Sequence, residues 1–306
     1  INTPASTVIL AENEFLGEDG RSFTVAEYKN MIGRAGRLGF NEKGKSILLA
    51  ENSIERRQLF QKYVLGTPEP VHSSFHRDAL PTWVLRLLSQ VHKILRAEVP
   101  RLLVHTFGGY LQARADPSWG AAVTADIECL LERMLTIGLA EEQGGQIQLT
   151  LLGKACGRSS LSFESALRLV ELLKQRDPRQ LTAGDLVAHL QVLQEADDIY
   201  TPLLKKGMIE SHRITDAQNR YGADTVRLLQ RYANETPDYW ARCKRAAILW
   251  DWMHGVKTEE IERYYSPNPY QGRVSYGDIR RIADATRFYL RSAQQIIAVL
   301  FTDNLE

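Results

Sequence analysis

The chain has 306 residues, of which 44% are hydrophobic and 25% are charged, with a formal net charge of +1. This length and composition favour a globular protein of two or three domains and exclude a disordered chain. No uninterrupted apolar run has the length of a membrane span, so we expect no membrane partner. The near-neutral charge excludes a protein that is basic all over, although it permits a local basic channel for nucleic acid.

Cysteine and histidine usage indicates the compartment and argues against a metal centre. The three cysteines, Cys129, Cys156 and Cys243, are scattered and odd in number, which favours a reducing compartment over a disulfide framework. No signal peptide opens the chain. We therefore expect a cytoplasmic protein, associated with the nucleoid or nuclear according to the organism. His72 and His76 are four residues apart without a cysteine pair, so we predict no metal site.

Residues 1–66 alternate between strand and helix, which predicts α/β organisation. Thr24, followed three residues later by Glu27, has the pattern of a helix N-terminal capping box. Strands are expected over Thr7–Leu10 and Ser46–Ala50, and helices over Thr24–Gly36 and Ser53–Val64. Because the chain enters a strand almost at once and does not start with Met, we expect it to be part of a longer protein.

A turn signal at Gly17–Gly20 lies between Glu14–Leu16 and Arg21–Val25, and this spacing predicts a β-hairpin.

Beyond Gly66, after a linker signal at Thr67–Pro70, the alternation of strand and helix gives way to mainly helical patterns. Leu80–Leu111 is predicted to be helical with a break at Pro100, and Thr124–Ile137 is predicted to be an amphipathic helix. Two short strands around the turn at Gln143–Gly145 follow it, and helix, strand, turn, strand is the winged-helix pattern. After Leu152 the chain is predicted to be almost entirely helical.

The most specific motif is the run Gly33–Arg37, which reads Gly-Arg-Ala-Gly-Arg. If it is helical, Arg34 and Arg37 lie three residues apart on one face. Two permanently charged, forked guanidinium groups are suited to neutralising charge on a γ-phosphate. The alternative is an exposed arginine pair that makes surface ion pairs, which the flanking glycines make less favourable.

This run resembles motif VI of superfamily 2 helicases, in the Ski-like branch that includes HelQ, its archaeal relatives and the helicase part of DNA polymerase theta. Ile1–Ala5 resembles the end of motif V, and Ser46–Leu49 resembles the strand after motif VI. The resemblance implies a second RecA-like domain whose arginines reach the phosphates of ATP, bound with Mg²⁺ in the full-length protein. Its site residues would be Asn30, Gly33, Arg34 and Arg37, although the family usually has Gln where this chain has Asn30.

The segment Gly39–Ser46 matches the P-loop pattern letter by letter but has the wrong context. A P-loop follows a strand and opens a helix, whereas here a helix precedes and a strand follows. We therefore expect the phosphate-binding loop in an upstream RecA-like domain of the same protein. The 306 residues alone are expected to bind neither ATP nor Mg²⁺ and to be inactive in ATP hydrolysis.

In the same family a β-hairpin between motifs V and VI separates the strands at a duplex fork. The resemblance assigns this role to the hairpin around Gly17–Gly20, with Phe15, Leu16 and Phe23 as an apolar wedge. A plain connection whose aromatic residues pack into the core is an equally good interpretation of the spacing.

The last predicted helix contains a row of arginines beside an aromatic residue. Arg280, Arg287 and Arg291 fall within about 40° of one another on a helical wheel. Arg281 and Phe288 share a neighbouring stripe, and arginine with an aromatic is suited to phosphate pairing and base stacking on a single strand. The alternative is an ordinary amphipathic helix with a solvated basic face.

The segment from Trp250 to Arg291 resembles the ratchet domain of these helicases, in which an arginine and an aromatic residue seven positions later contact DNA. Those positions match Arg281 and Phe288. The fold class expected is therefore mixed: a partial RecA-like α/β segment (1–66), a winged-helix domain (67–155) and an all-α ratchet bundle (156–306).

The function expected is that of the C-terminal part of an ATP-dependent DNA helicase. The family implies 3′-to-5′ movement on single-stranded or forked DNA. The alternatives are an RNA helicase of the same branch and a non-catalytic module that binds nucleic acid or protein.

Overall fold

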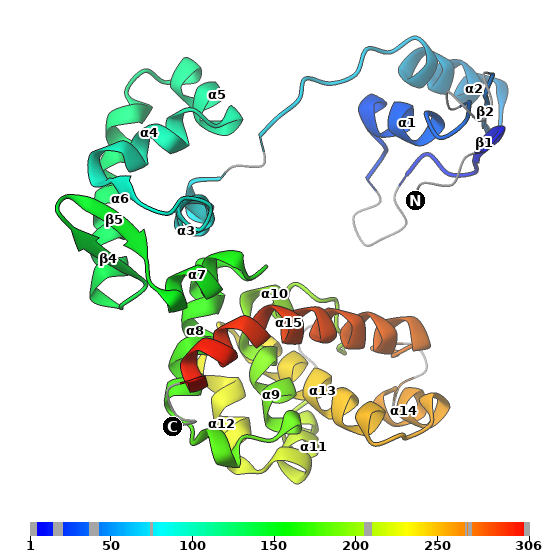
Figure 1. The fold of residues 1–306 in the computed structure, drawn as a ribbon. Helices are drawn as coiled ribbons and strands as arrows, with labels where there is room; N and C mark the ends of the chain where they lie inside the picture. Colours follow the sequence, from blue (N-terminus) through cyan, green and yellow to red (C-terminus); the bar gives the residue numbers. More distant parts are fainter. Residues whose placement is uncertain are drawn as a thin grey trace. The chain divides into compact units, whose positions relative to one another are not determined.

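The computed structural model divides the chain into two compact units, residues 1–73 and residues 74–306 (Figure 1). We call them the N-terminal unit and the helical unit. The structure describes residues 5–14, 21–36, 43–73, 76–204, 210–266, 268 and 271–302.

The N-terminal unit contains a parallel pair of strands, as the α/β pattern predicted. Strand β1 pairs with β2 in a register that runs from Thr7 opposite Lys45 to Leu10 opposite Leu48. A small core of Phe23, Tyr28 and Tyr63, joined by Leu59, holds the helices together. Its elements are β1 (Thr7–Leu10), α1 (Val25–Ile32), β2 (Lys45–Leu48), α2 (Ser53–Leu59) and the π-helix Phe60–Val64.

Helix α1 begins at the predicted capping box but ends early. The Thr24 hydroxyl accepts from the Glu27 N–H, and the Glu27 carboxylate accepts from the Thr24 N–H. Arg21 and these bonds lower the pKa of Glu27 to about 2. The helix was predicted to extend to Gly36, which is wrong: it ends at Ile32, with Gly33 as its C-cap.

The first part of the helical unit is a group of helices beside a three-stranded antiparallel sheet of order β3-β5-β4. Gly144 and Gly145 have φ of 60° and 74°, which a tight hairpin between β4 and β5 requires. The elements are α3 (Leu80–Leu88), β3 (Ile94–Leu95), α4 (Val99–Val104), α5 (Phe107–Ala115), α6 (Trp119–Thr136), β4 (Ala140–Gln143) and β5 (Gln146–Leu149).

The prediction of one broken helix over Leu80–Leu111 is wrong. Strand β3 interrupts it by pairing with β5 through Ile94 and Ile147. Pro100 lies in the first turn of α4, where a missing N–H costs nothing, so it starts a helix and does not break one. The predicted succession of helix, strand, turn and strand after residue 119 is confirmed.

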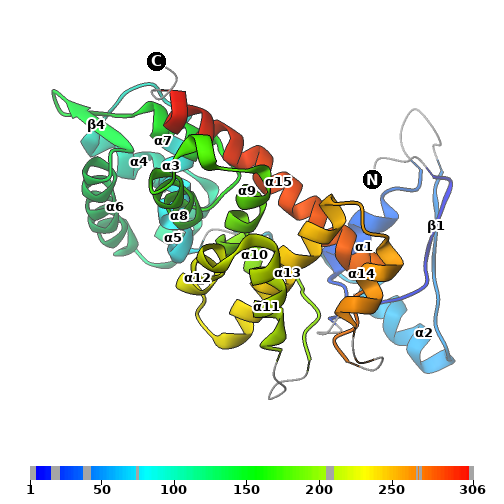
Figure 2. The same cartoon turned by 90° about the horizontal axis from the view of Figure 1, so that it is seen from below.

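The rest of the helical unit is almost entirely helical, as predicted. Figures 1 and 2 show α15 running along the bundle from α14 to α7, and it packs against α8 and α13 on the way. The α-helices are α7 (Leu151–Arg158), α8 (Phe163–Lys174), α9 (Ala183–His189), α10 (Gln194–Asp197), α11 (His212–Tyr221), α12 (Ala223–Arg231), α13 (Thr236–Met253), α14 (Thr258–Tyr265) and α15 (Tyr276–Thr302).

The larger of two hydrophobic clusters in the helical unit extends through both of its parts. It includes Leu85 and Ile127 before residue 155 and Leu169 and Ile282 after it. The division into a winged-helix domain and a ratchet bundle at residue 155 stays a prediction. Within the described ranges, no helix is long and apolar enough to cross a lipid bilayer.

Candidate nucleic-acid interface

Helix α15 is long and has two distinct faces. Its 27 residues extend for about 40 Å. Ile282, Ala293 and Ile296 are buried in the core of the helical unit. The predicted contact residues all lie on the exposed face, and these are Arg280, Arg281, Arg287, Phe288 and Arg291. Phe288 leaves 51% of its surface open, enough for a base to stack on the ring.

The buried side of α15 is fixed by polar contacts directly below this face. The Tyr289 hydroxyl donates to the Glu195 carbonyl at 2.7 Å. The Thr286 hydroxyl donates to the Ile282 carbonyl at 2.8 Å and accepts from the Gln191 amide at 3.3 Å. Thr286 and Tyr289 flank Arg287 and Phe288 in sequence, so these bonds set the rotation of the helix where the exposed groups project.

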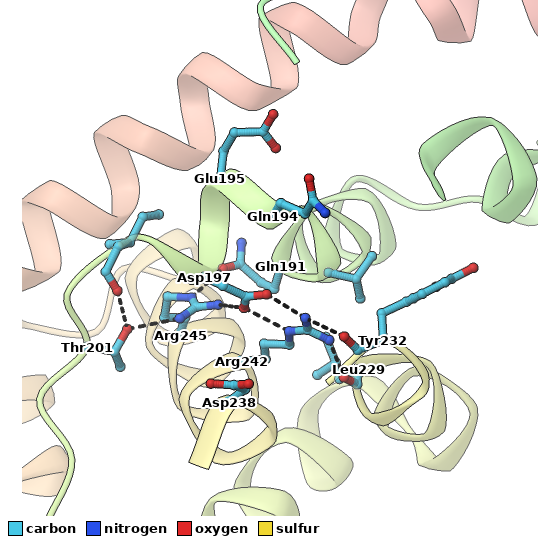
Figure 3. Close-up of polar contacts among 12 residues, drawn as sticks. Gln191, Gln194, Glu195, Asp197, Thr201, Leu229, Tyr232, Asp238, Arg242 and Arg245 are labelled. Atoms are coloured by element: carbon cyan, nitrogen blue, oxygen red, sulfur yellow. Dashed lines mark hydrogen bonds and ion pairs between the residues drawn. The ribbon is translucent and has the colours of Figure 1, made fainter. Parts of the chain in front are cut away.

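Gln191 connects α15 to a buried ionic network centred on Asp197 (Figure 3). Arg242 donates to both Asp197 carboxylate oxygens at 2.8 and 2.5 Å, and Arg245 donates to one of them at 3.1 Å. Arg245 also donates to the Gln191 amide oxygen and to the Thr201 hydroxyl, both at 3.1 Å. Each arginine side chain is only 1% exposed, and the Asp197 side chain is 26% exposed.

Two buried cations share one carboxylate here, so neutral acceptors complete the site. Arg242 donates to the carbonyls of Leu229 and Tyr232 at 3.1 and 2.9 Å. Loss of hydration lowers the pKa of Arg245, and Asp197 opposes that effect. Buried charges are retained only when they are paired and hydrogen-bonded, so this cluster requires one arrangement of α10, α13 and α15.

Sequence reasoning missed this cluster. The sequence patterns assigned no role to Asp197, Arg242 or Arg245. The available signal was the apolar run that surrounds Arg242, Lys244 and Arg245, because a helix that is apolar all round is buried and its charges need partners.

A second ion pair supports the helix that leads into α15. Arg220 donates to both carboxylate oxygens of Asp251 at 2.8 and 2.7 Å, and the Tyr265 hydroxyl donates to one of them at 2.8 Å. These contacts join α11, α13 and α14. Burial raises the pKa of Tyr265, so the hydroxyl stays protonated and remains a donor.

The predicted phosphate-contacting arginine of the N-terminal unit lies in a turn. Its position on a helical face was predicted wrongly, because the chain leaves α1 at Gly33 to pair with the segment before β1. The Ala5 N–H donates to the Arg34 carbonyl at 3.4 Å, and the Gly36 N–H donates to the Ala5 carbonyl at 3.2 Å. Arg37 lies outside the described residues, whereas Asn30 is exposed at the end of α1.

Glycine is required where this turn closes. Gly36 has φ of 71°, and a Cβ on it would lie 2.5 Å from the Gly44 backbone nitrogen. Such an approach excludes any side chain. The arginine motif is thus held by backbone contacts between two segments, and Arg34 is half-buried there.

The structure also bears on the predicted hairpin wedge. Glu14 bridges Ser22 in antiparallel fashion, which agrees with a hairpin, but Phe15 and Leu16 lie outside the described residues. Phe23 is 8% exposed and belongs to the core with Tyr28 and Tyr63, so its prediction as an exposed wedge is wrong.

The elements on either side of Gly39–Ser46 are those that argued against a P-loop. Helix α1 precedes this segment, and Lys45 and Ser46 lie in strand β2. Ser46 pairs with Val8 in the sheet and does not open a helix. Among the described residues, no three histidine, cysteine or acidic side chains are grouped so that they could hold a metal ion.

Comparison with known proteins relates this chain to one kind of helicase. No family model matches it. It is 22%, 25% and 26% identical to proteins named ATP-dependent DNA helicase Hel308 from Caldivirga maquilingensis, Methanocella arvoryzae and Pyrobaculum calidifontis. The alignments cover 97–98% of this chain and 39% of each relative, so the chain spans about two fifths of their length.

These similarities support the superfamily 2 helicase assignment, with Hel308-type DNA helicases as homologues. They do not separate HelQ from polymerase theta, and that finer assignment stays a prediction.

Proposed function

We propose that this chain is the strand-holding part of an ATP-dependent DNA helicase, and that α15 grips single-stranded DNA. The observation that carries the proposal is the exposed row of four arginines and Phe288 on a helix whose opposite face is fixed in the core. The names of the relatives state DNA helicase activity and ATP dependence for those proteins.

The grip combines two kinds of contact. The guanidinium groups pair with backbone phosphates of any sequence, and Phe288 stacks on a base. Neither contact reads base identity, as a motor that travels along DNA requires. The Gln191 and Tyr289 bonds keep α15 from rotating, so movement of the helical unit is passed to the strand.

The N-terminal unit supplies one side of the ATP site in this proposal. Arg34 extends from its glycine-locked turn to the γ-phosphate of ATP that an upstream RecA-like domain binds with Mg²⁺. Charge develops on the γ-phosphoryl group during hydrolysis, and a guanidinium neutralises it. Cycles of hydrolysis then move the strand, and family resemblance implies the 3′-to-5′ direction.

The test is the double variant Arg281→Ala/Phe288→Ala in the full-length protein. We expect it to bind labelled oligothymidylate about 10- to 100-fold more weakly, because one phosphate contact and one stacked base are lost. The slope of log affinity against log salt should fall by about 0.7. Fluorescence anisotropy over a salt series measures both.

The matched control is Arg227→Ala/Phe60→Ala, which removes an arginine and a phenylalanine that are similarly exposed on other helices. It should bind as the wild type does. Equal affinity of Arg281→Ala/Phe288→Ala and wild type would reject α15 as the grip. Oligouridylate tested in parallel distinguishes an RNA helicase, which would bind it at least as tightly as oligothymidylate.

A further inference from the structure

An acidic residue lies in the middle of the arginine row on α15. At 100° per residue, Asp284 falls about 20–60° from Arg280, Arg287 and Arg291 and about 40–60° from Phe288 and Arg281 on the other side. A surface adapted only for tight phosphate binding has no place for a carboxylate at its centre, since that charge repels every phosphate that approaches.

The carboxylate of Asp284 faces two of the arginines. The Arg280 Nε is 3.6 Å from Asp284 Oδ2, and the Arg287 Nη1 is 3.8 Å from Asp284 Oδ1. All three side chains are 55–68% exposed. These distances and exposures describe loose ion pairs that a stronger anion displaces easily.

The other acidic residue of α15 also lies near an arginine, because Asp278 Oδ1 is 3.7 Å from Arg281 Nη1, but it has a second task. Asp278 is 9% exposed and accepts from the Ser275 N–H at 2.9 Å and from the Ser275 hydroxyl at 2.6 Å. Its charge caps the start of the helix. The packing of the helix therefore accounts for Asp278 but not for Asp284.

We propose that Asp284 limits the grip of α15 on the strand. In the free protein it holds Arg280 and Arg287 in place over the exposed face. When DNA binds, the phosphates take over both arginines, and the carboxylate remains beside them as a repulsive charge. This inference rests on the proposed function of α15.

A built-in repulsive charge suits a motor because a strand that is held too tightly is released slowly. At physiological salt, the repulsion between the Asp284 carboxylate and phosphates is screened beyond short range. Asp284 therefore influences the one or two phosphates beside it. Asp284 thus acts as a positioning residue: it holds Arg280 and Arg287 before the strand binds, and it weakens their hold on the phosphates afterwards.

The test compares Asp284→Asn with wild type in the full-length protein, with labelled oligothymidylate as the probe. Removing the charge should tighten binding about two- to fivefold at low salt, as expected for one exposed charge pair. The salt slope should steepen by about 0.7, because loss of the Asp284 charge raises by one the net positive charge that faces the phosphates. Stopped-flow dissociation should slow by a similar factor.

Two variants serve as controls. Asp284→Glu keeps the charge and should bind as the wild type does. Asp224→Asn removes the carboxylate of a similarly exposed pair with Arg227 on α12 and should also leave binding unchanged. An unchanged melting temperature of Asp284→Asn shows that its fold is intact, and the salt slope reports charge independently of folding.

The outcomes separate this inference from the function beneath it. If Arg281→Ala/Phe288→Ala weakens binding but Asp284→Asn leaves affinity and salt slope unchanged, Asp284 does not limit the grip. If neither variant changes binding, α15 is not the strand-holding helix, and both proposals are wrong.

Discussion

The two arginine sites of this protein are built in opposite ways. Arg34 lies in a turn whose shape is set by backbone bonds to Ala5 and by the close approach of Gly36 and Gly44. The arginines of α15 project from a regular helix whose far side is fixed by the Asp197 network and by Tyr289. One site depends on the exact path of the backbone, and the other depends on the packing of a helix.

This difference corresponds to the two tasks proposed. Neutralising a γ-phosphate requires one guanidinium at one position. A turn whose backbone path is fixed by closely approaching glycines provides that position. Holding a moving strand requires many equivalent contacts along a line, and a long helix provides those at regular intervals. The predictions that follow, from the largest expected effect to the smallest, test whether the two sites are independent.

The largest effect is expected for Arg34→Ala in the full-length protein. Loss of the charge that stabilises the transferring phosphoryl group should lower DNA-stimulated ATP hydrolysis about 10³-fold or more. Binding of oligothymidylate should stay at the wild-type level, since α15 is unchanged. A coupled phosphate-release assay and anisotropy measure the two activities.

The control is Arg57→Ala, which removes an exposed arginine of α2. It should hydrolyse ATP at the wild-type rate. Normal turnover in Arg34→Ala would contradict its assignment to the phosphates and leave its turn with a purely structural role.

The second effect is on stability, through Asp197→Ala. This change leaves the buried guanidinium groups of Arg242 and Arg245 without their carboxylate, so we expect a loss of about 3–5 kcal/mol in the free energy of unfolding. Urea unfolding followed by tryptophan fluorescence measures it, because all five tryptophans of the chain lie in the helical unit.

Asp198→Ala provides a neighbouring control, because Asp198 is exposed. Its effect should be below about 0.5 kcal/mol. A similarly small loss for Asp197→Ala would show that the network does not fix α15, and the contrast between the two arginine sites would then disappear.

The smallest effect is a pH dependence of the helical unit through His189. Burial lowers the pKa of His189 to about 4, with Arg176 acting in the same direction and Asp185 opposing it. The unfolded chain, with an ordinary pKa of about 6.5, binds more protons between these two values. Stability should therefore rise from pH 4 to pH 6.5, by at most about 3 kcal/mol.

His189→Leu should flatten this part of the stability curve, whereas His92→Leu, at an exposed position, should not. The capping box of the N-terminal unit titrates elsewhere: Glu27, with a pKa of about 2, keeps its contribution above about pH 4.5 and loses it only as pH falls towards 2. An unchanged slope in His189→Leu would assign the acid sensitivity to other groups.

The sequence predicted elements well where the signal was local. The capping box at Thr24, the strand Thr7–Leu10 and the exposed arginine row around Arg281 and Phe288 agree with the structure. Each depends on residues that lie close together in the sequence. Errors arose where a distant segment decided the outcome, as when β5 turned residues 94–95 into a strand and Ala5 ended α1 early.

The site shows the same division. Residue types and helical spacing along Tyr276–Thr302 determined by themselves that one face of α15 is basic and the other apolar, because a helix places every residue by its number alone. Only the tertiary structure decided that Phe23 is buried, that Arg34 lies in a glycine-locked turn, and that Asp197 joins Arg242 and Arg245 below α15. Those outcomes depend on contacts between residues up to 48 positions apart, and no local pattern encodes which distant partner a buried charge or an aromatic ring will meet.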